Sequence, residues 1–196
     1  PNVSGWSRYA GNLHGYLANY TNWTKVVDGT QLTTTTYATS DNVDEALQWI
    51  QARQVPWCLM LAFDAPHAPY HVPPSHLHGR NLAGLDPQVQ PLPFYKAAVE
   101  ALDTEIGRLL AGIPPAVLAN TNIVFTSDNG TPPEVTELPL RPWRAKGTLY
   151  QGGIRVPLIV KGPAVVNPGR TSAALVDMVD LMPTVGAMAQ GPPGML

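Results

Sequence analysis

The chain has 196 residues, of which 44% are hydrophobic and only 13% are charged. This composition is typical of a folded globular protein with a real core, and the length fits one domain. The formal net charge of −2 gives no electrostatic reason to expect nucleic acid or an anionic membrane as a partner. The longest apolar run, residues 57–63, is shorter than the roughly 20 residues that span a bilayer.

The first half of the chain predicts one helix and one strand. Residues 1–40 are rich in Gly, Asn, Thr and Tyr, so we expect loops and short extended pieces there. The sequence Asn42-Val-Asp-Glu45 resembles a capping box, and the apolar side chains after it predict a helix over 43–53. The continuous apolar run 57–63 predicts a strand buried on both faces. The proline-rich residues 64–93, which hold four of the five histidines, predict a long ordered loop.

The second half continues the alternation of helices and strands. The expected elements are a helix over 93–111, a strand over 122–127, a proline-rich loop over 131–145, a strand over 156–160 and a last helix over 181–190 capped by Asp180. Such alternation predicts an α/β fold, layered α/β/α with a mainly parallel sheet.

The strand 122–127 leads directly into Asp128, Asn129 and Gly130. Ligands and metals bind at the carboxyl ends of strands in open α/β sheets, and the glycine allows a sharp turn. Asp128 and Asn129 would offer hard oxygen ligands to a divalent cation, although both residue types are also common in ordinary turns. Two side chains cannot complete a shell of six or more oxygens, so further carboxylates would have to come from elsewhere.

His67 follows the predicted strand 57–63 and lies between Pro66 and Pro69. A histidine held at a strand end can donate to an anion or protonate a leaving group, whereas the plainer interpretation is a loop histidine bonded to a backbone carbonyl. The spacing of His67 and His71 matches a zinc-binding helix, but the prolines exclude a regular helix there. His76 and His78 could also bind a metal, although solvated loop residues are the simpler reading.

Lys146 lies sixteen residues after Gly130, the last residue of the Asp-Asn-Gly turn, and precedes Gly152-Gly153. A lysine in such a loop is either solvated or a point charge for a sulfate or phosphate oxygen. The double glycine indicates a tight turn or a close backbone approach. The sequence motifs of P-loop nucleotide binding, dinucleotide binding, zincins and α/β-hydrolases are absent from the 196 residues.

Taken together, these segments resemble the sulfatase family over residues 35–190. Leu-Ala-Phe-Asp-Ala-Pro-His-Ala-Pro, Phe-Thr-Ser-Asp-Asn-Gly and Ala-Lys-Gly-Thr-Leu-Tyr-Gln-Gly-Gly-Ile-Arg-Val-Pro are similar to its histidine segment, its metal-binding turn and its lysine stretch. They stand in the family's order, and Gln151 stands where glutamate is usual.

The resemblance implies an enzyme of the alkaline phosphatase superfamily that uses Ca²⁺ to hydrolyse sulfate esters. Mg²⁺ or Mn²⁺ could replace Ca²⁺. Asp128 and Asn129 would bind the metal. His67 and Lys146 would hold the sulfate, and His67 would also assist departure of the alcohol. Family members are usually exported, to the periplasm, the lysosome or the exterior.

The chain also departs from the family pattern. The family's nucleophile is a Cys or Ser in Cys/Ser-x-Pro-x-Arg, converted to formylglycine, but Cys58 is followed by Leu-Met-Leu, and the early Asp-Asp pair is absent as well. We therefore expect residues 1–196 to be one partial catalytic domain, lacking the N-terminal nucleophile segment and the C-terminal subdomain. On its own it should be inactive.

Three functions stay open on sequence grounds. The first is the sulfatase, acting on a small-molecule or saccharide sulfate ester, with Tyr70, Trp143 and Arg144 as candidates for substrate contact. The second is a phosphodiesterase or phosphonate hydrolase of the same superfamily. The third is a non-catalytic binding module that keeps the fold.

Overall fold

The structure, a computed structural model, describes residues 5–189, and these form two compact units. The first unit is built from the chain up to Ile113 together with Pro132–Pro142. The second is built from Pro114–Thr131 together with the chain from Trp143 onward.

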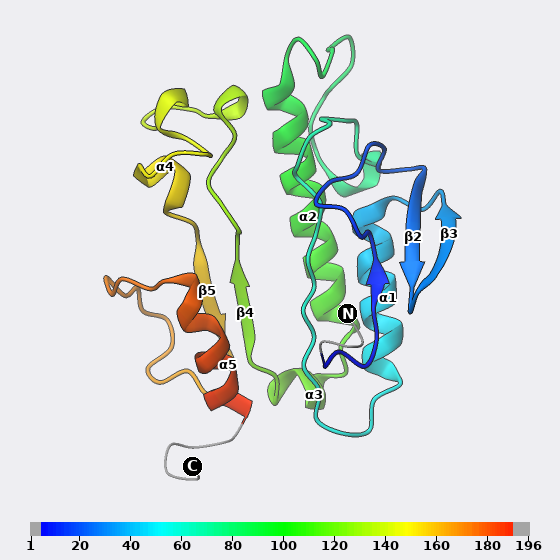
Figure 1. Ribbon diagram of the computed structural model, residues 1–196, viewed down its shortest axis with the longest axis vertical. Helices are drawn as coiled ribbons and strands as arrows, with labels where there is room; N and C mark the ends of the chain where they lie inside the picture. The colour runs from blue at the N-terminus through cyan, green and yellow to red at the C-terminus, as the bar shows by residue number, and fades with distance from the viewer. Residues whose placement is uncertain (1–4, 190–196) are drawn as a thin grey trace. The chain divides into compact units, whose positions relative to one another are not determined.

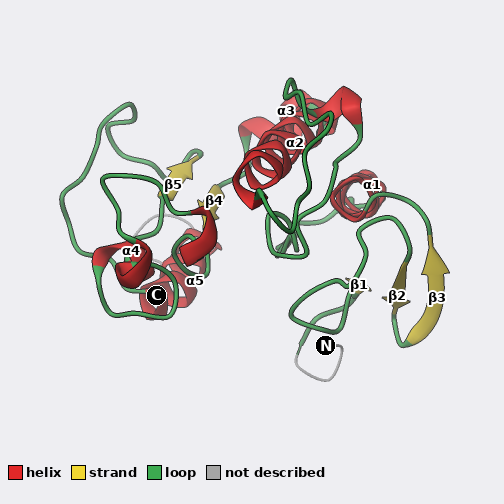
Figure 2. Cartoon of the chain, turned by 90° about the horizontal axis from the view of Figure 1, so that it is seen from above, coloured by secondary structure: helices red, strands yellow, loops and turns green. Residues whose placement is uncertain are grey.

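The first unit combines a small antiparallel sheet with two long helices. The sheet has the order β1-β2-β3, with β1 at Ala10–Gly11, β2 at Trp23–Val27 and β3 at Thr30–Thr34. Its helices are α1, Ala38–Gln51, and α2, Pro91–Gly112. Seen from above, α1 lies between the sheet and α2 (Figure 2).

The core of this unit lies where the helices meet the loops around them. Each helix buries one stripe of small or apolar residues, including Val43 and Ala46 on α1 and Ala97 and Ala101 on α2. Periodic burial of this kind holds an amphipathic helix in place more strongly than helix propensity does. One core cluster, called here the aromatic cluster, joins three aromatic residues and the aliphatic residues around them from separate segments: Leu17, Tyr20, Trp23, Tyr37, Ala38, Ala65, Leu77 and Ala101.

Ion pairs connect the helices and the sheet. Lys25 on β2 has its side chain only 8% exposed and contacts Asp41 at 2.6 Å and Glu45 at 2.7 Å. On α2, Glu105 accepts a hydrogen bond from Ser40 Oγ of α1 at 2.6 Å and one from Arg108 Nε of its own helix at 2.7 Å. Buried charges are tolerated when they are paired and hydrogen-bonded in this way.

The second unit is smaller and begins with α3, Pro115–Ala119. Its sheet pairs β4, Ile123–Thr126, with β5, Leu158–Lys161, in antiparallel register with Phe125 opposite Ile159. The helix α4, Gln151–Ile154, precedes β5, and α5 covers Leu181–Ala189. The strands and α5 can be followed in Figure 1. No helix of the described part, residues 5–189, is long and apolar enough to cross a bilayer.

Most predicted elements are confirmed with shifted ends. The helix predicted over 93–111 is α2, and the strands predicted over 122–127 and 156–160 are β4 and β5. The helix predicted over 43–53 starts five residues earlier, at Ala38, so the expected capping box at Asn42 is wrong. The last helix is confirmed as far as Ala189, while residue 190 lies outside the described residues. The predicted cap is wrong, because Asp180 ends a turn of 3₁₀ helix, Met178–Asp180, whose own N-cap is Asp177.

Two expectations about strands are wrong. Residues 57–63 form no strand in the described structure, although their exposure alternates, with Cys58, Met60 and Ala62 on the exposed side. A strand requires a hydrogen-bonded neighbour, and none of the described segments pairs with this run. The sheet was also expected to be mainly parallel, whereas every strand pair in the described residues is antiparallel.

The contacts of Glu105 make a first prediction. Glu105→Ala removes the acceptor of both Ser40 and Arg108 and leaves a cavity between α1 and α2, so the free energy of unfolding should fall by about 2–4 kcal/mol in urea titrations. The matched control is Glu137→Ala, which breaks an ion pair with Lys96. The Glu137 side chain is 52% exposed, so this loss should cost less than about 1 kcal/mol. Equal losses for the two variants would contradict the importance of the buried contact.

Candidate functional site

Asp128 and Asn129 lie in the turn that follows β4. Ser127 Oγ donates to the carbonyl of Asn129 at 2.9 Å, and the side-chain Nδ2 of Asn129 donates to the carbonyl of Gly130 at 3.2 Å. The amide nitrogen of Asn129 is thereby engaged, while its Oδ1 and the exposed carboxylate of Asp128 accept no hydrogen bond within residues 5–189. The turn therefore presents acceptor oxygens of the kind that hard cations bind.

The chain around Lys146 packs directly against this turn. Lys146 N donates to Thr131 O at 3.0 Å, and Gly130 N donates to Gly153 O at 2.9 Å. The approach is closer than any side chain would allow, because a Cβ on Gly130 would lie 1.9 Å from Gly152 O. A Cβ on Gly152 would likewise lie 2.3 Å from the carbonyl of Arg144. The close backbone approach predicted for Gly152-Gly153 is thus confirmed, within the short helix α4.

This packing brings three of the four candidate residues together. Asp128, Asn129 and Lys146 all belong to the second unit and are linked by the two backbone hydrogen bonds just described. Lys146 is half-buried and its ammonium pairs with no carboxylate of residues 5–189. A cation and free oxygen ligands on two adjacent segments suit an anionic ester bound to a metal.

His67 belongs to the first unit, so its convergence with the other three residues stays a prediction. It is exposed and closes a tight turn, in which His67 N donates to Asp64 O at 2.9 Å. Its ring Nδ1 lies 2.8 Å from Ala68 O. Because a carbonyl can only accept, Nδ1 carries the proton, and Nε2 is the atom left for an anion or a leaving group.

The carboxylate of Asp64 interacts electrostatically with this histidine. Burial raises the pKa of Asp64, and the Asn12 amide and the His67 imidazole act against that rise. Asn12 Nδ2 donates to Asp64 Oδ1 at 3.2 Å. Neither contact was predicted, because nothing in the glycine- and asparagine-rich residues 1–40 marks Asn12 as a neighbour of the histidine turn.

The donor set fits a calcium ion only in part. Among residues 5–189, no group of three or more His, Cys, Asp or Glu side chains could hold a metal. Asp128 and Asn129 after β4 are the two ligands expected from the sequence. A complete calcium shell needs six to eight oxygens, so further ligands would have to come from elsewhere. His78 does not add to them, because its Nε2 faces Pro73 O at 3.3 Å and its Nδ1 accepts from Arg80 N at 3.2 Å.

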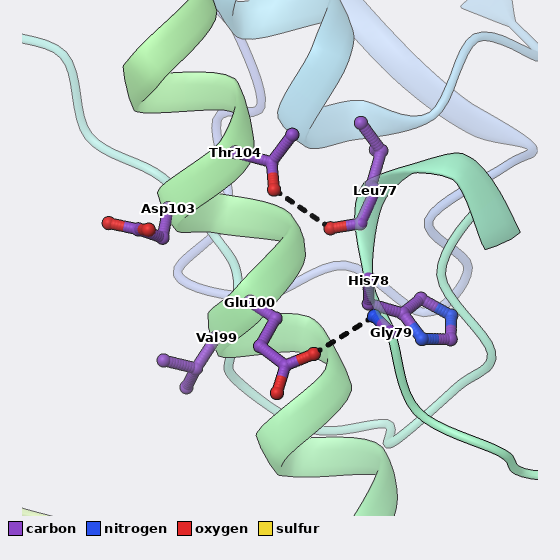
Figure 3. Close-up of a pocket in the computed structure, with 7 residues that line it drawn as sticks. All are labelled: Leu77, His78, Gly79, Val99, Glu100, Asp103 and Thr104. Carbon is purple, nitrogen blue, oxygen red and sulfur yellow. Dashed lines mark hydrogen bonds between the residues drawn. The ribbon is translucent and has the colours of Figure 1, made fainter.

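A shallow pocket in the first unit involves none of the four candidates. It lies between α2 and the segment Leu77–Gly79, as Figure 3 shows. Glu100 accepts from Gly79 N at 3.1 Å and pairs with Arg80 at 2.6 Å, while Thr104 Oγ1 donates to Leu77 O at 2.9 Å. The polar side chains that line the pocket therefore hold residues 77–80 against α2.

The candidates for substrate contact have different surroundings. Tyr70 is tied to the first unit, since its hydroxyl donates to Glu134 at 2.9 Å. In the second unit, the guanidinium of Arg144 lies 4.6 Å from the ring centre of Tyr150, and Trp143 is 67% exposed. An exposed aromatic and basic surface therefore flanks Lys146.

The glycine packing makes a second prediction. Gly130→Ala places a methyl group against the carbonyl of Gly152, so the turn must move and the free energy of unfolding should fall by about 2 kcal/mol or more. Calorimetric titration should show weakened Ca²⁺ binding. The control is Gly186→Ala on α5, where a Cβ meets nothing within 4 Å and alanine favours the helix by up to about 1 kcal/mol. An unchanged stability and affinity in Gly130→Ala would show that the turn does not depend on the close approach.

Comparison with known proteins identifies the family. The sequence profile described as Sulfatase matches residues 3–191. The chain is 33% identical to the steryl-sulfatase of Mus musculus over 74% of its own length and 23% of that protein. It is 30% identical to the N-acetylglucosamine-6-sulfatase of Homo sapiens over 66% of its length and 28% of that protein. The chain thus spans about a quarter of the length of these relatives.

The structural match agrees with the sequence match. The crystal structure of Ps i-CgsB in complex with k-i-k-neocarrahexaose superposes with a TM-score of 0.79 at 26% identity, covering 96% of this chain and 47% of that one. The α/β fold expected from the resemblance, that of the alkaline phosphatase superfamily, is confirmed by this likeness. The chain belongs to the sulfatase family.

Proposed function

We propose that the protein carrying this chain is a sulfuric ester hydrolase that uses a divalent cation, Ca²⁺, to hydrolyse a sulfate ester. The observation that supports the proposal is the packing of the Asp128–Gly130 turn against the Lys146 segment, in which the Asp128 carboxylate, Oδ1 of Asn129 and the Lys146 ammonium have no partner among residues 5–189. Membership of the sulfatase family supports the same chemistry.

Each residue has a distinct role in this proposal. The Asp128 carboxylate and Oδ1 of Asn129 bind Ca²⁺, which when bound supplies a Lewis acid for a sulfate oxygen. Lys146 holds the sulfate as a point charge and offsets the charge that develops on its oxygens. His67 contributes Nε2, since its Nδ1 is occupied by Ala68 O. In its protonated form this atom holds the sulfate and then donates to the departing alcohol oxygen.

The proposed chemistry also needs a nucleophile and further metal ligands. Cys58 lacks the Pro and Arg context of the family's nucleophile, and residues 5–189 hold no group of three or more His, Cys, Asp or Glu side chains that could bind a metal. We infer that a formylglycine and further carboxylates are supplied by the rest of the protein, whose relatives are several times longer than the chain. Both units then form parts of one catalytic domain.

The substrate class that fits best is a sulfated saccharide. The surface beside Lys146 combines the exposed ring of Trp143 with the Arg144–Tyr150 stack. Aromatic faces and guanidinium groups suit sugar rings and their anionic substituents. Two similar proteins support the class, one named for N-acetylglucosamine-6-sulfate chemistry and one solved with k-i-k-neocarrahexaose.

The function is tested with single variants of the protein that carries the chain. His67→Ala should lower kcat for a sulfated saccharide by about 10²–10⁴-fold, because proton transfer to the alcohol is lost. Lys146→Ala should lower it by about 10²–10³-fold through lost charge stabilisation. Asp128→Ala should abolish stoichiometric Ca²⁺ binding, measured by calorimetry.

Matched controls separate these effects from general damage. His76→Ala and Lys161→Ala remove an exposed histidine and an exposed lysine that have no role in the proposed function and should keep wild-type kcat. The proposal would be overturned by a faster reaction with the corresponding phosphate ester, or by His67 and Lys146 variants that match their controls.

A further inference from the structure

One hydroxyl group contacts the main chain at both ends of the turn that presents His67. The turn runs from Asp64 to His67 and is closed by the hydrogen bond from His67 N to Asp64 O. Tyr20 Oη lies 2.9 Å from Asp64 O and 2.8 Å from His67 O, so it contacts the carbonyl at each end of the turn. Both carbonyls can only accept, and the phenol shares its one proton between them.

The ring that carries this hydroxyl is itself fixed. Tyr20 is 2% exposed within the aromatic core cluster, and its ring stacks on His71 with centroids 4.0 Å apart. His71 is held on both sides, since its Nδ1 donates to Pro69 O at 3.1 Å and its Nε2 accepts from Tyr37 Oη at 3.1 Å. A side chain with this many constraints has one available position, so its hydroxyl is preorganised.

The charge states of the cluster agree with these roles. Burial raises the pKa of Tyr20, so the phenol stays a donor across the working pH range. Burial lowers the pKa of His71, which favours the neutral ring that can accept from Tyr37.

We propose that Tyr20 is a positioning residue for His67: its hydroxyl fixes the two carbonyls that set the orientation of the His67 main chain, and hence the direction of Nε2. This role rests on the proposed function, in which His67 acts on the sulfate ester. An imidazole misplaced by about 1 Å can lose on the order of 10²-fold in rate, so a contact to the main chain of the turn is enough to affect catalysis.

The obvious alternative is that Tyr20 only fills the core. Tyr20→Phe distinguishes a positioning role from a core-filling role, because it keeps the ring, the stack on His71 and the packing while it removes both contacts to the turn. Tyr37→Phe is the matched control, since it removes a buried hydroxyl of the same cluster that bonds His71 and not the turn. Both variants should show similar, modest drops in melting temperature.

The decisive measurement is a double-mutant cycle on kcat in the protein that carries the chain. Tyr20→Phe should lower kcat by about 10–100-fold with little change in KM, and Tyr37→Phe should lower it less than about threefold. In a His67→Ala background, Tyr20→Phe should cause no further loss, because it acts only through the histidine. The NMR signals of the His67 ring should shift clearly more in Tyr20→Phe than in Tyr37→Phe, which reaches the turn only indirectly, through His71 and Tyr20.

The possible failures are distinguishable. An equal loss from Tyr20→Phe in both backgrounds, or equal losses for the two tyrosine variants, would overturn the positioning role while leaving the proposed function intact. If His67→Ala itself left sulfate-ester hydrolysis unchanged, both the proposed function and the role of Tyr20 would fall.

Discussion

The contact between the backbone of Gly130 and that of Gly152 and Gly153 is the constraint on which the candidate site depends. Two main-chain hydrogen bonds and three positions without room for a Cβ hold the turn after β4 against the lysine segment. Glycine is required there by close approach rather than by unusual dihedral angles, since Gly130, Gly152 and Gly153 do not have positive φ. The metal-type oxygens and the ammonium consequently share one unit of the structure.

The first unit supports the histidine by a different means. Its long helices are joined by the hydrogen bond from Ser40 Oγ on α1 to the buried Glu105 on α2, and the loop that carries His67 is anchored to the aromatic cluster by Tyr20. Rigid packing far from the reacting atoms is a common way to hold a catalytic side chain that lies on an exposed loop. The Nδ1 contact to Ala68 O then selects which ring nitrogen is available.

Local sequence patterns predicted the elements that local forces determine. The periodicity of α2 and the apolar run of β4 located both elements to within about two residues, and the Asp-Asn-Gly turn followed from the end of β4. Features that depend on distant partners were missed. Residues 57–63 have the apolar character of a strand but no pairing neighbour in the described part of the chain. The contact between Tyr20 and His67 bridges 47 residues and left no signal in the sequence.

The central claim is that His67, Asp128, Asn129 and Lys146 act in one site, and it is tested most directly by paramagnetic relaxation in the protein that carries the chain. Mn²⁺ bound in place of Ca²⁺ should strongly broaden the His67 ring signals. Asp128→Ala should remove that broadening, because it removes a ligand of the ion. Sharp His67 signals in the presence of stoichiometrically bound Mn²⁺ would contradict the account.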